Sequence, residues 1–446
     1  MQNREKRYIN REIFSEVSAH LDQGEMTLIT GSRQVGKTVL LEQLKQYLVN
    51  KKKVKSEYIF HYNLDIIQDE EVFHNQTQFI EFLEDRSAKQ KIYVFVDEAQ
   101  KVPEAARFFK GVYDSKLNVK LVLTGSSSLE IKAKFKEVLT GRKIIFQLDS
   151  FSFVEFLRAK DKILANMLVG ERKITSIDQK QLVKLYKEYI TYGGYPRVVL
   201  AQQKKEKDNI LREIYSSYIE RDAVSFLAIK NKTAFNRLVK LLSAQIGQLV
   251  NIDELATNLA VDRNTVERYL HVLEETFIIK KINPYFKNQR QEIIKAGKIY
   301  FRDCGIRNLA LENFNFFDDR TDKGSLLENA VSGELLFLNS QRAGKLYFWR
   351  TKQKAEVDFV IEKGLKLLPI EVKTRHKKSS VPKGLRSFLK KFSVQEAIIV
   401  SLSAGEDFSI NLSAYPSGQP ARRPAGKTKI SVIYPFDLRS IISKLK

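Results

Sequence analysis

The sequence has few of the residues that build disulfides and metal centres. It contains one cysteine, Cys304, and five scattered histidines among 446 residues. A lone cysteine excludes an intrachain disulfide and fits a reducing compartment, so we expect the protein in the cytoplasm. The spacings H-x-x-x-H and C-x-x-C that mark metal sites do not occur, which argues against bound zinc.

Long apolar runs are also missing. No segment approaches the ~20 apolar residues of a membrane span, and the charged first residues lead into no apolar core of signal-peptide length. We therefore expect a soluble protein without a membrane partner. Hydrophobic residues make up 43% and aromatic residues 11% of the chain, which favours a globular fold over disorder. The length of 446 residues predicts about three domains.

Acidic residues are outnumbered by basic ones. Lys and Arg total 76 against 53 Asp and Glu, which gives a formal charge of +23. Such an excess suits a phosphate backbone or an anionic membrane surface as a partner. The alternative is that an AT-rich genome has enriched lysine without any nucleic-acid role.

A phosphate-binding loop of the pattern G-x-x-x-x-G-K-[ST] follows an apolar strand at residues 26–30. Its members are Gly31, Ser32, Arg33, Gln34, Val35, Gly36, Lys37 and Thr38. In such a loop the backbone N–H groups bind the β-phosphate, Lys37 reaches the β- and γ-oxygens, and the Thr38 hydroxyl binds Mg²⁺. The apolar recurrence over 39–48 predicts a helix that begins at the phosphates. We expect ATP or GTP binding; the alternative is a glycine-rich turn with an incidental lysine.

A Walker B pattern follows at residues 91–98, where an apolar run ends in Asp97 and Glu98. Asp97 would hold the Mg²⁺ shell of the nucleotide, and Glu98 would polarise the attacking water. This pair favours hydrolysis over nucleotide binding alone. The structural alternative is an exposed pair of carboxylates at a strand end.

Two further candidates belong to the same predicted sheet. The apolar strand 119–124 leads into small hydroxyl residues, so Thr124 or Ser126 would sense the γ-phosphate or simply form a turn. Arg142 precedes the strand-like run 143–148. It is a candidate arginine finger, acting in cis or from a neighbouring subunit of a homo-oligomer.

These motifs, in this order, resemble the AAA-type prokaryotic ATPases fused to domain of unknown function 4143. The resemblance rests first on Gly-Ser-Arg-Gln-Val-Gly-Lys-Thr, Val-Asp-Glu-Ala, Leu-Thr-Gly-Ser-Ser and Gly-Arg. Later segments that share it are 192–196, 218–222, 298–305, 349–350, 356–359 and 370–373, so it covers most of residues 10–375. Ser32 stands where the family usually has proline, and Asp149 stands where a proline often precedes the Ser-Phe segment. The resemblance implies the fold and a site for ATP rather than a pathway.

Residues 236–290 are interpreted as a winged helix. A first helix covers 235–242, Asp253 is expected to cap a second that runs to 260, and Asp262 is expected to cap a third. The short connection between the second and third helices has helix-turn-helix geometry, and 277–287 would form the wing. The third helix would bury Val266, Leu270 and Leu273.

The opposite face of the third helix is polar and would suit a DNA groove. It carries Arg263, Asn264, Arg268 and His271, and the wing adds Lys280, Lys281 and Lys287. Asn264 and the arginines would face bases while the wing lysines meet phosphates. The alternative is that the winged helix only connects domains or binds protein.

The C-terminal region holds a second chemical constellation. Strands at 356–361 and 366–373 form a predicted hairpin whose layout resembles the PD-(D/E)xK nuclease core. In such a site Asp358 and Glu371 coordinate Mg²⁺, and Lys373 orients the attacking water. A preceding helix would supply Glu328, with Glu334 as the alternative. A half-buried structural hairpin, or a site kept for binding without turnover, are the competing interpretations.

Together these patterns predict an α/β protein with three parts. Residues 1–158 form a P-loop NTPase domain with a parallel sheet, 159–290 a helical segment with a winged helix, and 291–446 a restriction-endonuclease-like α/β domain. The expected function is an Mg²⁺-dependent ATPase that acts on duplex or branched DNA. The alternative is a signalling or scaffolding ATPase whose C-terminal domains bind proteins and cleave no nucleic acid.

Overall fold

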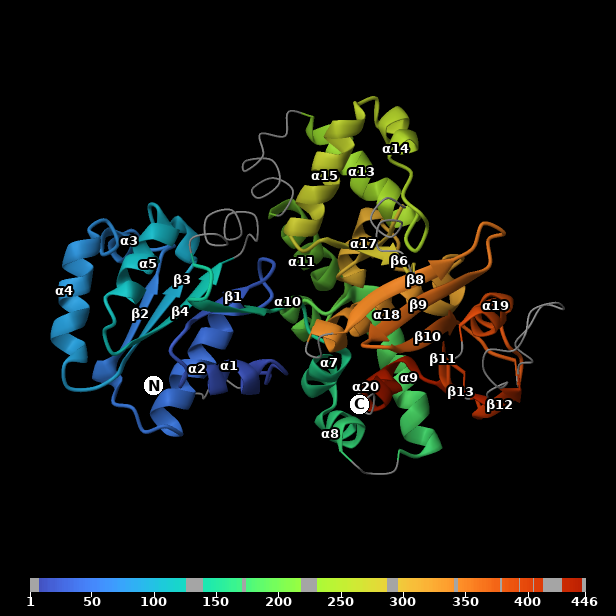
Figure 1. Ribbon diagram of the computed structural model, residues 1–446, viewed down its shortest axis with the longest axis horizontal. Coiled ribbons are helices and arrows are strands. Elements are labelled where there is room, and N and C mark those ends of the chain that lie inside the picture. The colour runs from blue at the N-terminus through green and yellow to red at the C-terminus, as the bar shows by residue number, and fades with distance from the viewer. Residues whose placement is uncertain are drawn as a thin grey trace. The chain divides into compact units, whose positions relative to one another are not determined.

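The computed structural model describes residues 8–125, 139–170, 174–217, 231–286, 296–340, 344–377, 379–392, 394–403, 405–411 and 427–442 (Figure 1). The chain forms two compact units and enters each of them more than once. The first unit comprises Met1–Lys162, Tyr195–Lys230 and His271–Ile278, and the second comprises Ile163–Gly194, Asn231–Leu270 and Ile279–Lys446. The division into three domains at 158 and 290 stays a prediction.

The first unit contains a five-stranded sheet in which every pairing is parallel. The strands are β1 (Met26–Thr30), β2 (Ile59–Asn63), β3 (Ile92–Asp97), β4 (Val119–Gly125) and β5 (Lys143–Gln147), in the order β2-β3-β4-β1-β5. β1 and β3 are buried along their whole length, as their continuous apolar runs predict. The predicted parallel α/β domain is therefore confirmed, and the carboxyl ends of its strands share one edge.

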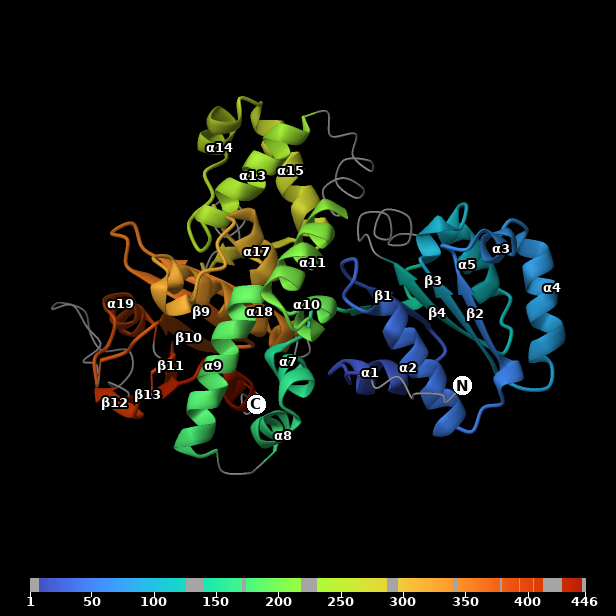
Figure 2. The ribbon, with the colours of Figure 1, turned by 180° about the vertical axis from the view of Figure 1, so that it is seen from behind.

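Helices cover this sheet. They are α1 (Phe14–His20), α2 (Lys37–Asn50), α3 (Ile67–Glu71), α4 (Gln76–Ser87) and α5 (Ala105–Asp114). Figures 1 and 2 show α1 and α2 gathered at one side of the sheet, and α3, α4 and α5 at the other. Phe73, Phe79 and Phe109 are almost fully buried in a shared core with strand residues such as Val94.

The described residues of the first unit also form α7 (Phe153–Lys160), α10 (Pro196–Leu200) and α11 (Lys204–Ser217). α7 begins with a capping box, in which the Ser152 hydroxyl accepts from the Glu155 N–H and the Glu155 carboxylate accepts from the Ser152 N–H. α10 packs against both α7 and α11. This brings a segment from beyond residue 194 to the same unit as the phosphate-binding loop.

The second unit combines helices with a mixed sheet. Its helices are α8 (Lys162–Val169), α9 (Ser176–Tyr192), α13 (Lys232–Ala244), α14 (Ile252–Leu259), α15 (Arg263–Glu275), α17 (Cys304–Ala310), α18 (Lys323–Ser340), α19 (Lys383–Lys391) and α20 (Leu438–Ile442). α8 starts at the boundary residue of the first unit, and the end of α15 from His271 onward belongs to the first unit.

The three helices expected in the middle segment are present as α13, α14 and α15. Asp262 caps α15 as predicted, because its carboxylate accepts from the Thr265 N–H at 2.8 Å. The cap of α14 was misassigned: the Asn251 side chain accepts from the N–H groups of Asp253 and Glu254, so Asp253 lies inside the first turn. The predicted apolar face is buried at Val266 and Leu273, while Leu270 is only half-buried.

The sheet of the second unit has eight strands in the order β12-β13-β11-β10-β9-β8-β6-β7. They are β6 (Ile279–Pro284), β7 (Lys298–Phe301), β8 (Lys345–Arg350), β9 (Glu356–Lys363), β10 (Lys366–Lys373), β11 (Glu396–Ser401), β12 (Phe408–Asn411) and β13 (Lys427–Ile433). β9 and β10 form the predicted antiparallel hairpin. β6, expected as part of a wing, pairs with β7 and also with β8, so it belongs to the same sheet as the hairpin.

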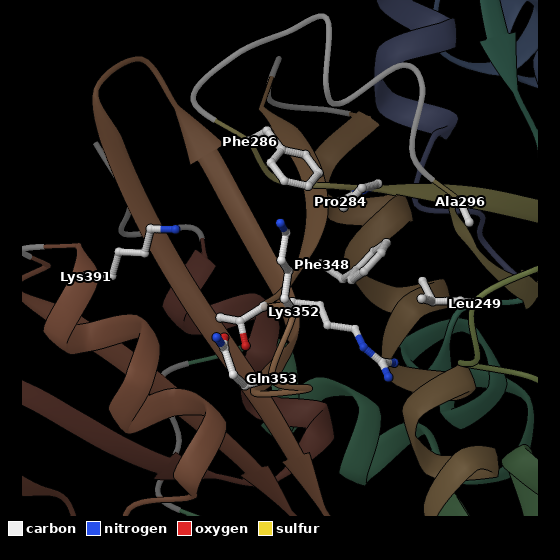
Figure 3. A pocket seen from close by; sticks show the side chains of 10 residues that line it. Leu249, Pro284, Phe286, Ala296, Phe348, Lys352, Gln353 and Lys391 are labelled. Carbon is white, nitrogen blue, oxygen red and sulfur yellow. The ribbon is translucent and has the colours of Figure 1, made fainter.

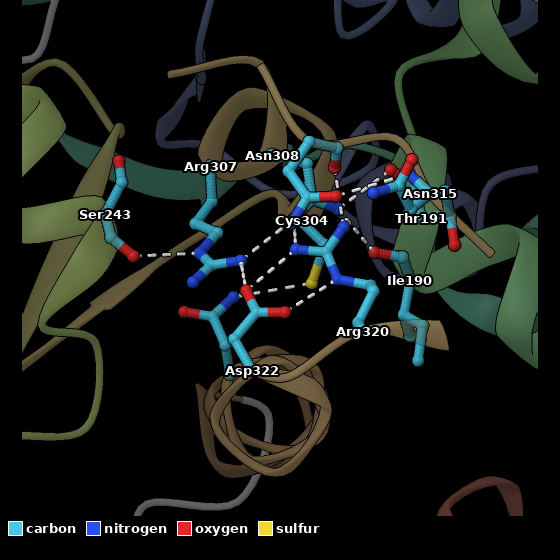
Figure 4. Close-up of polar contacts among 11 residues, drawn as sticks. Ile190, Thr191, Ser243, Cys304, Arg307, Asn308, Asn315, Arg320 and Asp322 are labelled. Carbon is cyan, nitrogen blue, oxygen red and sulfur yellow. Dashed lines mark hydrogen bonds and ion pairs between the residues drawn. The ribbon is translucent and has the colours of Figure 1, made fainter. Parts of the chain in front are cut away.

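A buried ion-pair network fixes α17 within the second unit (Figure 4). The Arg307 and Arg320 side chains are almost fully buried and both contact the Asp322 carboxylate. Asn308 donates to the carbonyls of Ile190 and Thr191 at 3.0 and 2.8 Å, which ties α17 to the end of α9. The two buried guanidinium groups need a partner of opposite charge, because an unpaired buried guanidinium strongly destabilises a fold.

Candidate functional site

The phosphate-binding loop connects the end of β1 to the start of α2. Gln34 and Gly36 have φ values of 61° and 98°, and the value at Gly36 is one that glycine adopts without strain. A Cβ atom on Gly31 would lie 2.0 Å from the Leu148 carbonyl oxygen, so only glycine fits there. No side chain caps the N-terminus of α2. The backbone N–H groups of the loop and of this helix end can therefore bind an anion.

Lys37 and Thr38 occupy the first two positions of α2. The buried Lys37 ammonium donates to the carbonyl oxygens of Gly31 and Ser32, both at 3.1 Å. The Thr38 hydroxyl donates to Asp97 Oδ2 at 2.6 Å. The loop and the predicted Walker B strand therefore meet at the carboxyl edge of the sheet.

Asp97 is buried at the end of β3 and contacts two hydroxyl groups. Besides Thr38, the Thr124 hydroxyl of β4 donates to Asp97 Oδ1, and the Glu98 N–H donates to Thr124 at 3.0 Å. Thr124 thus lies within strand β4 with its hydroxyl in the site. Ser126, the other sensor candidate, lies outside the described residues.

Glu98 follows Asp97 in a left-handed backbone conformation, with a φ of 58°. Its carboxylate accepts a hydrogen bond from Gln100 Nε2 at 2.5 Å. A non-glycine residue held at positive φ is strained, and such strain often occurs at functional sites. The contact with Gln100 was not predicted, although the residue lies only two positions further along the chain.

The rest of the loop is held by residues distant in the sequence, all from the first unit. Arg11 donates to the Val35 carbonyl at 2.7 Å and to the Asp149 carbonyl at 2.6 Å. Its guanidinium also pairs with the buried Glu155 at 3.1 Å. Sequence patterns did not indicate Arg11, because the three contacts join positions more than 20 residues apart.

Two more loop residues contact the segment that begins at Tyr195. The Ser32 hydroxyl and the Tyr195 hydroxyl lie 3.2 Å apart. Arg197 of α10 donates to the Gln34 side chain at 3.0 Å and pairs with Glu213 of α11 at 2.8 Å. Arg33 is half-exposed on the same loop.

The structure excludes one of the two arrangements predicted for Arg142. The Met26 N–H donates to the Arg142 carbonyl, which places Arg142 at the amino edge of the sheet. The phosphate-binding loop lies at the opposite edge, one strand of five residues or about 17 Å away. The Arg142 guanidinium pairs instead with Asp114 at 2.8 Å. An arginine finger in cis is therefore wrong, and one that acts on a neighbouring copy stays a prediction.

The second candidate site lies on the β9–β10 hairpin. The Val372 N–H donates to Asp358 Oδ2 at 2.8 Å, which fixes the Asp358 carboxylate next to the returning strand. The Lys373 ammonium pairs with the buried Glu371 at 2.7 Å. The structure thus brings together the three hairpin residues that the sequence singled out.

The helix residue that joins them is Glu328 of α18. Its carboxylate accepts from the Tyr300 hydroxyl at 2.6 Å and from the Lys298 ammonium at 3.3 Å. The alternative, Glu334, lies 3.7 Å from Arg439. The charge of Glu328 interacts with that of Asp358.

Lys298 was missed by sequence reasoning. It is almost fully buried on β7 and pairs with Glu356 at 2.6 Å as well as with Glu328. Arg350 pairs with the second oxygen of Glu356 at 2.9 Å. Lys298 and Tyr300 lie two residues apart on one strand, so they share a face. That alternation in an otherwise apolar strand was the available signal.

Burial and mutual repulsion perturb these carboxyl groups. Burial, followed by the charge of Asp358, raises the pKa of Glu371 to about 8 and that of Glu328 to about 7. Burial also raises the pKa of Asp358, against the opposing effect of Lys298. Strongly perturbed carboxyl groups that lie together are typical of functional sites, although structural ion pairs produce them too.

The carboxylates of this site could supply only some of the ligands that a divalent cation needs. Glu371 Oε2 is buried and has no hydrogen-bond partner among the described residues. In the same part of the chain, no three His, Cys, Asp or Glu side chains form a group that could hold a metal ion. Mg²⁺ is often bound by one or two carboxylates, with water and substrate phosphate as the other ligands. Asp358 and Glu371 fit that smaller set.

Three family models match successive parts of the chain. Residues 23–157 match the family described as "AAA domain", and residues 323–416 match "Domain of unknown function (DUF4143)". Residues 183–316 between them match "Domain of unknown function (DUF8612)". The resemblance drawn from the motifs is thus confirmed for the AAA domain and the DUF4143 segment.

The chain is also similar to uncharacterized proteins along most of its length. One from Haemophilus influenzae is 28% identical over 376 residues, which cover 82% of this chain and 87% of that protein. One from Methanocaldococcus jannaschii is 28% identical over 368 residues, which cover 79% and 75%. Neither name assigns an activity.

Similar solved structures include the Aeropyrum pernix ORC1 protein in complex with DNA, at 13% identity and a TM-score of 0.28, covering 67% of this chain and 91% of that one. The Aeropyrum pernix ORC2 protein in its ADP form has 13% identity and a TM-score of 0.32, with coverages of 62% and 90%. Scores this low carry no argument about function. Among the described residues, no helix has both the length and the apolar character to cross a bilayer.

Proposed function

We propose that the first unit is an Mg²⁺-dependent ATP hydrolase. The observation that carries this proposal is the 2.6 Å contact between the Thr38 hydroxyl and Asp97. It joins the phosphate-binding loop to the Walker B carboxylate at the edge where nucleotides bind in such sheets. The match of residues 23–157 to an AAA domain supports the same assignment.

Each residue of the loop has a distinct part in this proposal. Backbone N–H groups between Gly31 and Thr38 would bind the phosphates, and Lys37 would exchange its loop carbonyl partners for β- and γ-oxygens. Thr38 and Asp97 are oxygen donors of the kind that Mg²⁺ prefers, and they would hold it. Bound Mg²⁺ would neutralise charge on the β- and γ-phosphates.

Glu98 would orient and deprotonate the attacking water. Its position after Asp97 places the carboxylate at the same sheet edge, and the Gln100 amide holds one of its oxygens. Thr124 would hold Asp97 and the Glu98 backbone together through its hydroxyl. General-base assistance of this kind contributes about 10²–10⁴ in rate.

The test is ATP hydrolysis by the full chain with two variants. Lys37→Ala should abolish ATP binding, whereas Glu98→Gln should bind ATP and lose at least about 10² in kcat. Lys89→Ala and Glu84→Gln change exposed residues of the same unit and serve as matched controls. Unchanged ATP affinity in Lys37→Ala, or normal turnover in Glu98→Gln, would contradict the assignment.

We further propose that the ATPase acts on DNA and that the second unit contributes a nuclease-like site. The support is the arrangement of Asp358, Glu371 and Lys373 on one hairpin with Glu328 opposite. Asp358 and Glu371 would hold Mg²⁺, and Lys373 would orient the water. Exposed basic residues that follow the hairpin in the sequence, namely Arg375, Lys377, Lys383 and Lys390, would meet the phosphate backbone.

Cleavage of linear, circular and branched DNA in Mg²⁺ or Mn²⁺, with and without ATP, tests this second proposal. Asp358→Asn should abolish cleavage, while Glu396→Gln at an exposed strand start should leave it unchanged. If the DNA stays intact under every condition, the second unit would be a binding module without nuclease activity. DNA affinity that does not depend on salt would favour the scaffolding alternative, because phosphate contacts always produce a salt dependence.

A further inference from the structure

A pocket of about 690 Å³ lies in the second unit, beside the end of β8 (Figure 3). Phe348 of β8 and Phe286, just beyond β6, contribute rings to it. Arg350, Lys352 and Gln353 line it from the end of β8 and the following turn, and Lys391 lines it from α19. Its volume is in the range of pockets that hold small ligands or single residues of a polymer.

The lining is positively charged. It includes three cationic side chains, and the described lining residues include no acidic one. Arg350 is already paired with Glu356 at 2.9 Å. Lys352 is exposed and has no ion-pair partner among the described residues, and Lys391 is exposed with its ammonium 5.8 Å from the Trp349 ring centre. Two ammonium groups therefore remain available for an anionic ligand.

The apolar part of the lining offers an aromatic surface. Phe286 is half-exposed, whereas Phe348 is 1% exposed and contributes to the wall of the pocket. Figure 3 shows the Lys352 side chain pointing toward Phe286. An exposed ring beside ammonium groups is the combination with which proteins bind unpaired nucleic-acid strands, since bases stack on rings and phosphates pair with cations.

The position of the pocket adds a second argument. Arg350 lines the pocket and pairs with Glu356, which pairs with Lys298, which in turn contacts Glu328. The pocket is thus connected to the carboxylate cluster by a chain of three ion pairs. A ligand that binds Arg350 would therefore contact the same network of charges as the cluster.

We propose that this pocket binds an unpaired segment of DNA, with a base against Phe286 and successive phosphates on Lys352 and Lys391. The choice of DNA rests on the proposed function. The two ammonium groups come from different elements, the turn after β8 and α19.

The experiment measures equilibrium binding of a fluorescent thymidine 12-mer to the full chain by anisotropy, in EDTA so that no cleavage occurs. A second oligonucleotide of equal length has abasic sites in place of its central bases. Phe286→Ala should weaken binding of the thymidine strand about tenfold, which corresponds to the loss of one stacked base. It should leave the affinity for the abasic strand unchanged, because that strand has no base to stack.

The double variant Lys352→Gln/Lys391→Gln should reduce the slope of log affinity against log salt by about 1.4, since each phosphate contact contributes about 0.7 in single strands. Lys345→Gln, at the exposed opposite end of β8, is the matched control and should keep the wild-type affinity. Thermal unfolding followed by circular dichroism checks that Phe286→Ala remains folded.

The outcomes separate this inference from the proposed function. The proposed strand binding by the pocket is wrong if both pocket variants keep the wild-type affinity, or if Phe286→Ala weakens binding of the two oligonucleotides equally. Either result contradicts it even if the protein hydrolyses ATP and cleaves DNA. Binding of duplex DNA alone overturns it as well. Conversely, strand binding that follows the pocket variants supports the inference even where Asp358→Asn shows that no cleavage occurs.

Discussion

The Arg11 guanidinium donates to the Val35 carbonyl at 2.7 Å, so a side chain that precedes the first helix holds the phosphate-binding loop in place. The same guanidinium pairs with Glu155, which is buried and would otherwise be left without its cationic partner. Burial raises the pKa of Glu155, and Arg11 opposes that shift. Arg11 therefore couples the loop to α7 within the first unit.

Arg11→Lys tests whether this contact shapes the loop for nucleotide. A lysine keeps the charge but cannot reach three partners with one planar fork, so we expect ATP affinity to fall about tenfold. Titration with a fluorescent ATP analogue measures it. Arg107→Lys, an exposed residue paired with Glu104, is the control. Unchanged ATP affinity with a lower melting temperature would show that Arg11 supports only the fold.

The second prediction concerns Gln100, which donates to Glu98 at 2.5 Å. Gln100→Leu keeps the side-chain volume and removes the donor, so the Glu98 carboxylate should lose its orientation toward water. We expect kcat for ATP to fall about tenfold while KM stays the same. Steady-state hydrolysis by Gln100→Leu and by the exposed control Gln90→Leu provides the comparison. A rise in KM alone would place Gln100 in nucleotide binding instead.

The sequence predicted those parts of the site that depend on local patterns. The loop from Gly31 to Thr38, the Asp97–Glu98 strand end and the 356–373 hairpin are continuous segments with an apolar period that fixes their geometry. Arg11 and Tyr195 could not be predicted, because their contacts join residues 24 and 163 positions apart. No local spacing encodes a contact of that kind.

The role expected of Arg142 in cis conflicts with the place of its strand in the sheet. A Gly-Arg pair before a strand suggests an arginine finger, acting in cis or from a neighbouring subunit, and the direction of that strand decides which edge of the sheet the arginine occupies. Because β5 runs parallel to β1, the residue before β5 lies at the edge opposite the nucleotide loop. The predicted parallel sheet already implied this edge, so an arginine finger in cis did not follow from the predicted fold.

Asp322 gives a prediction about acid stability. Burial acts to raise its pKa, but hydrogen bonds from Arg320 and Arg307 outweigh burial and lower the pKa to about 2. The folded pKa lies below the unfolded value of about 4, so the ion pairs stabilise the fold fully above pH ~4, and this contribution is lost as the pH falls toward 2. Asp322→Asn should therefore reduce the free energy of unfolding at pH 7 by about 3 kcal/mol.

Urea unfolding followed by circular dichroism at several pH values measures this effect. The difference between the wild type and Asp322→Asn should shrink as the pH drops from about 4 toward 2, because the wild-type carboxylate becomes protonated. Asp319→Asn changes an exposed aspartate on the same connection and should differ little from the wild type. A difference that does not vary with pH would mean that Asp322 acts through packing rather than charge.

Lys298 offers the sharpest test of the carboxylate cluster as a charged network. It is 1% exposed and is paired with Glu328 and Glu356. Lys298→Met should leave Glu328 with the Tyr300 hydroxyl as its one hydrogen-bond partner among the described residues, and reduce the free energy of unfolding by about 3–5 kcal/mol. Lys345→Met on the exposed start of β8 should have little effect. If repulsion among unpaired carboxylates causes the loss, adding Glu328→Gln should recover part of it. The double variant should then be more stable than the sum of the single losses predicts, whereas additive losses in urea unfolding would show that Lys298 and Glu328 contribute independently.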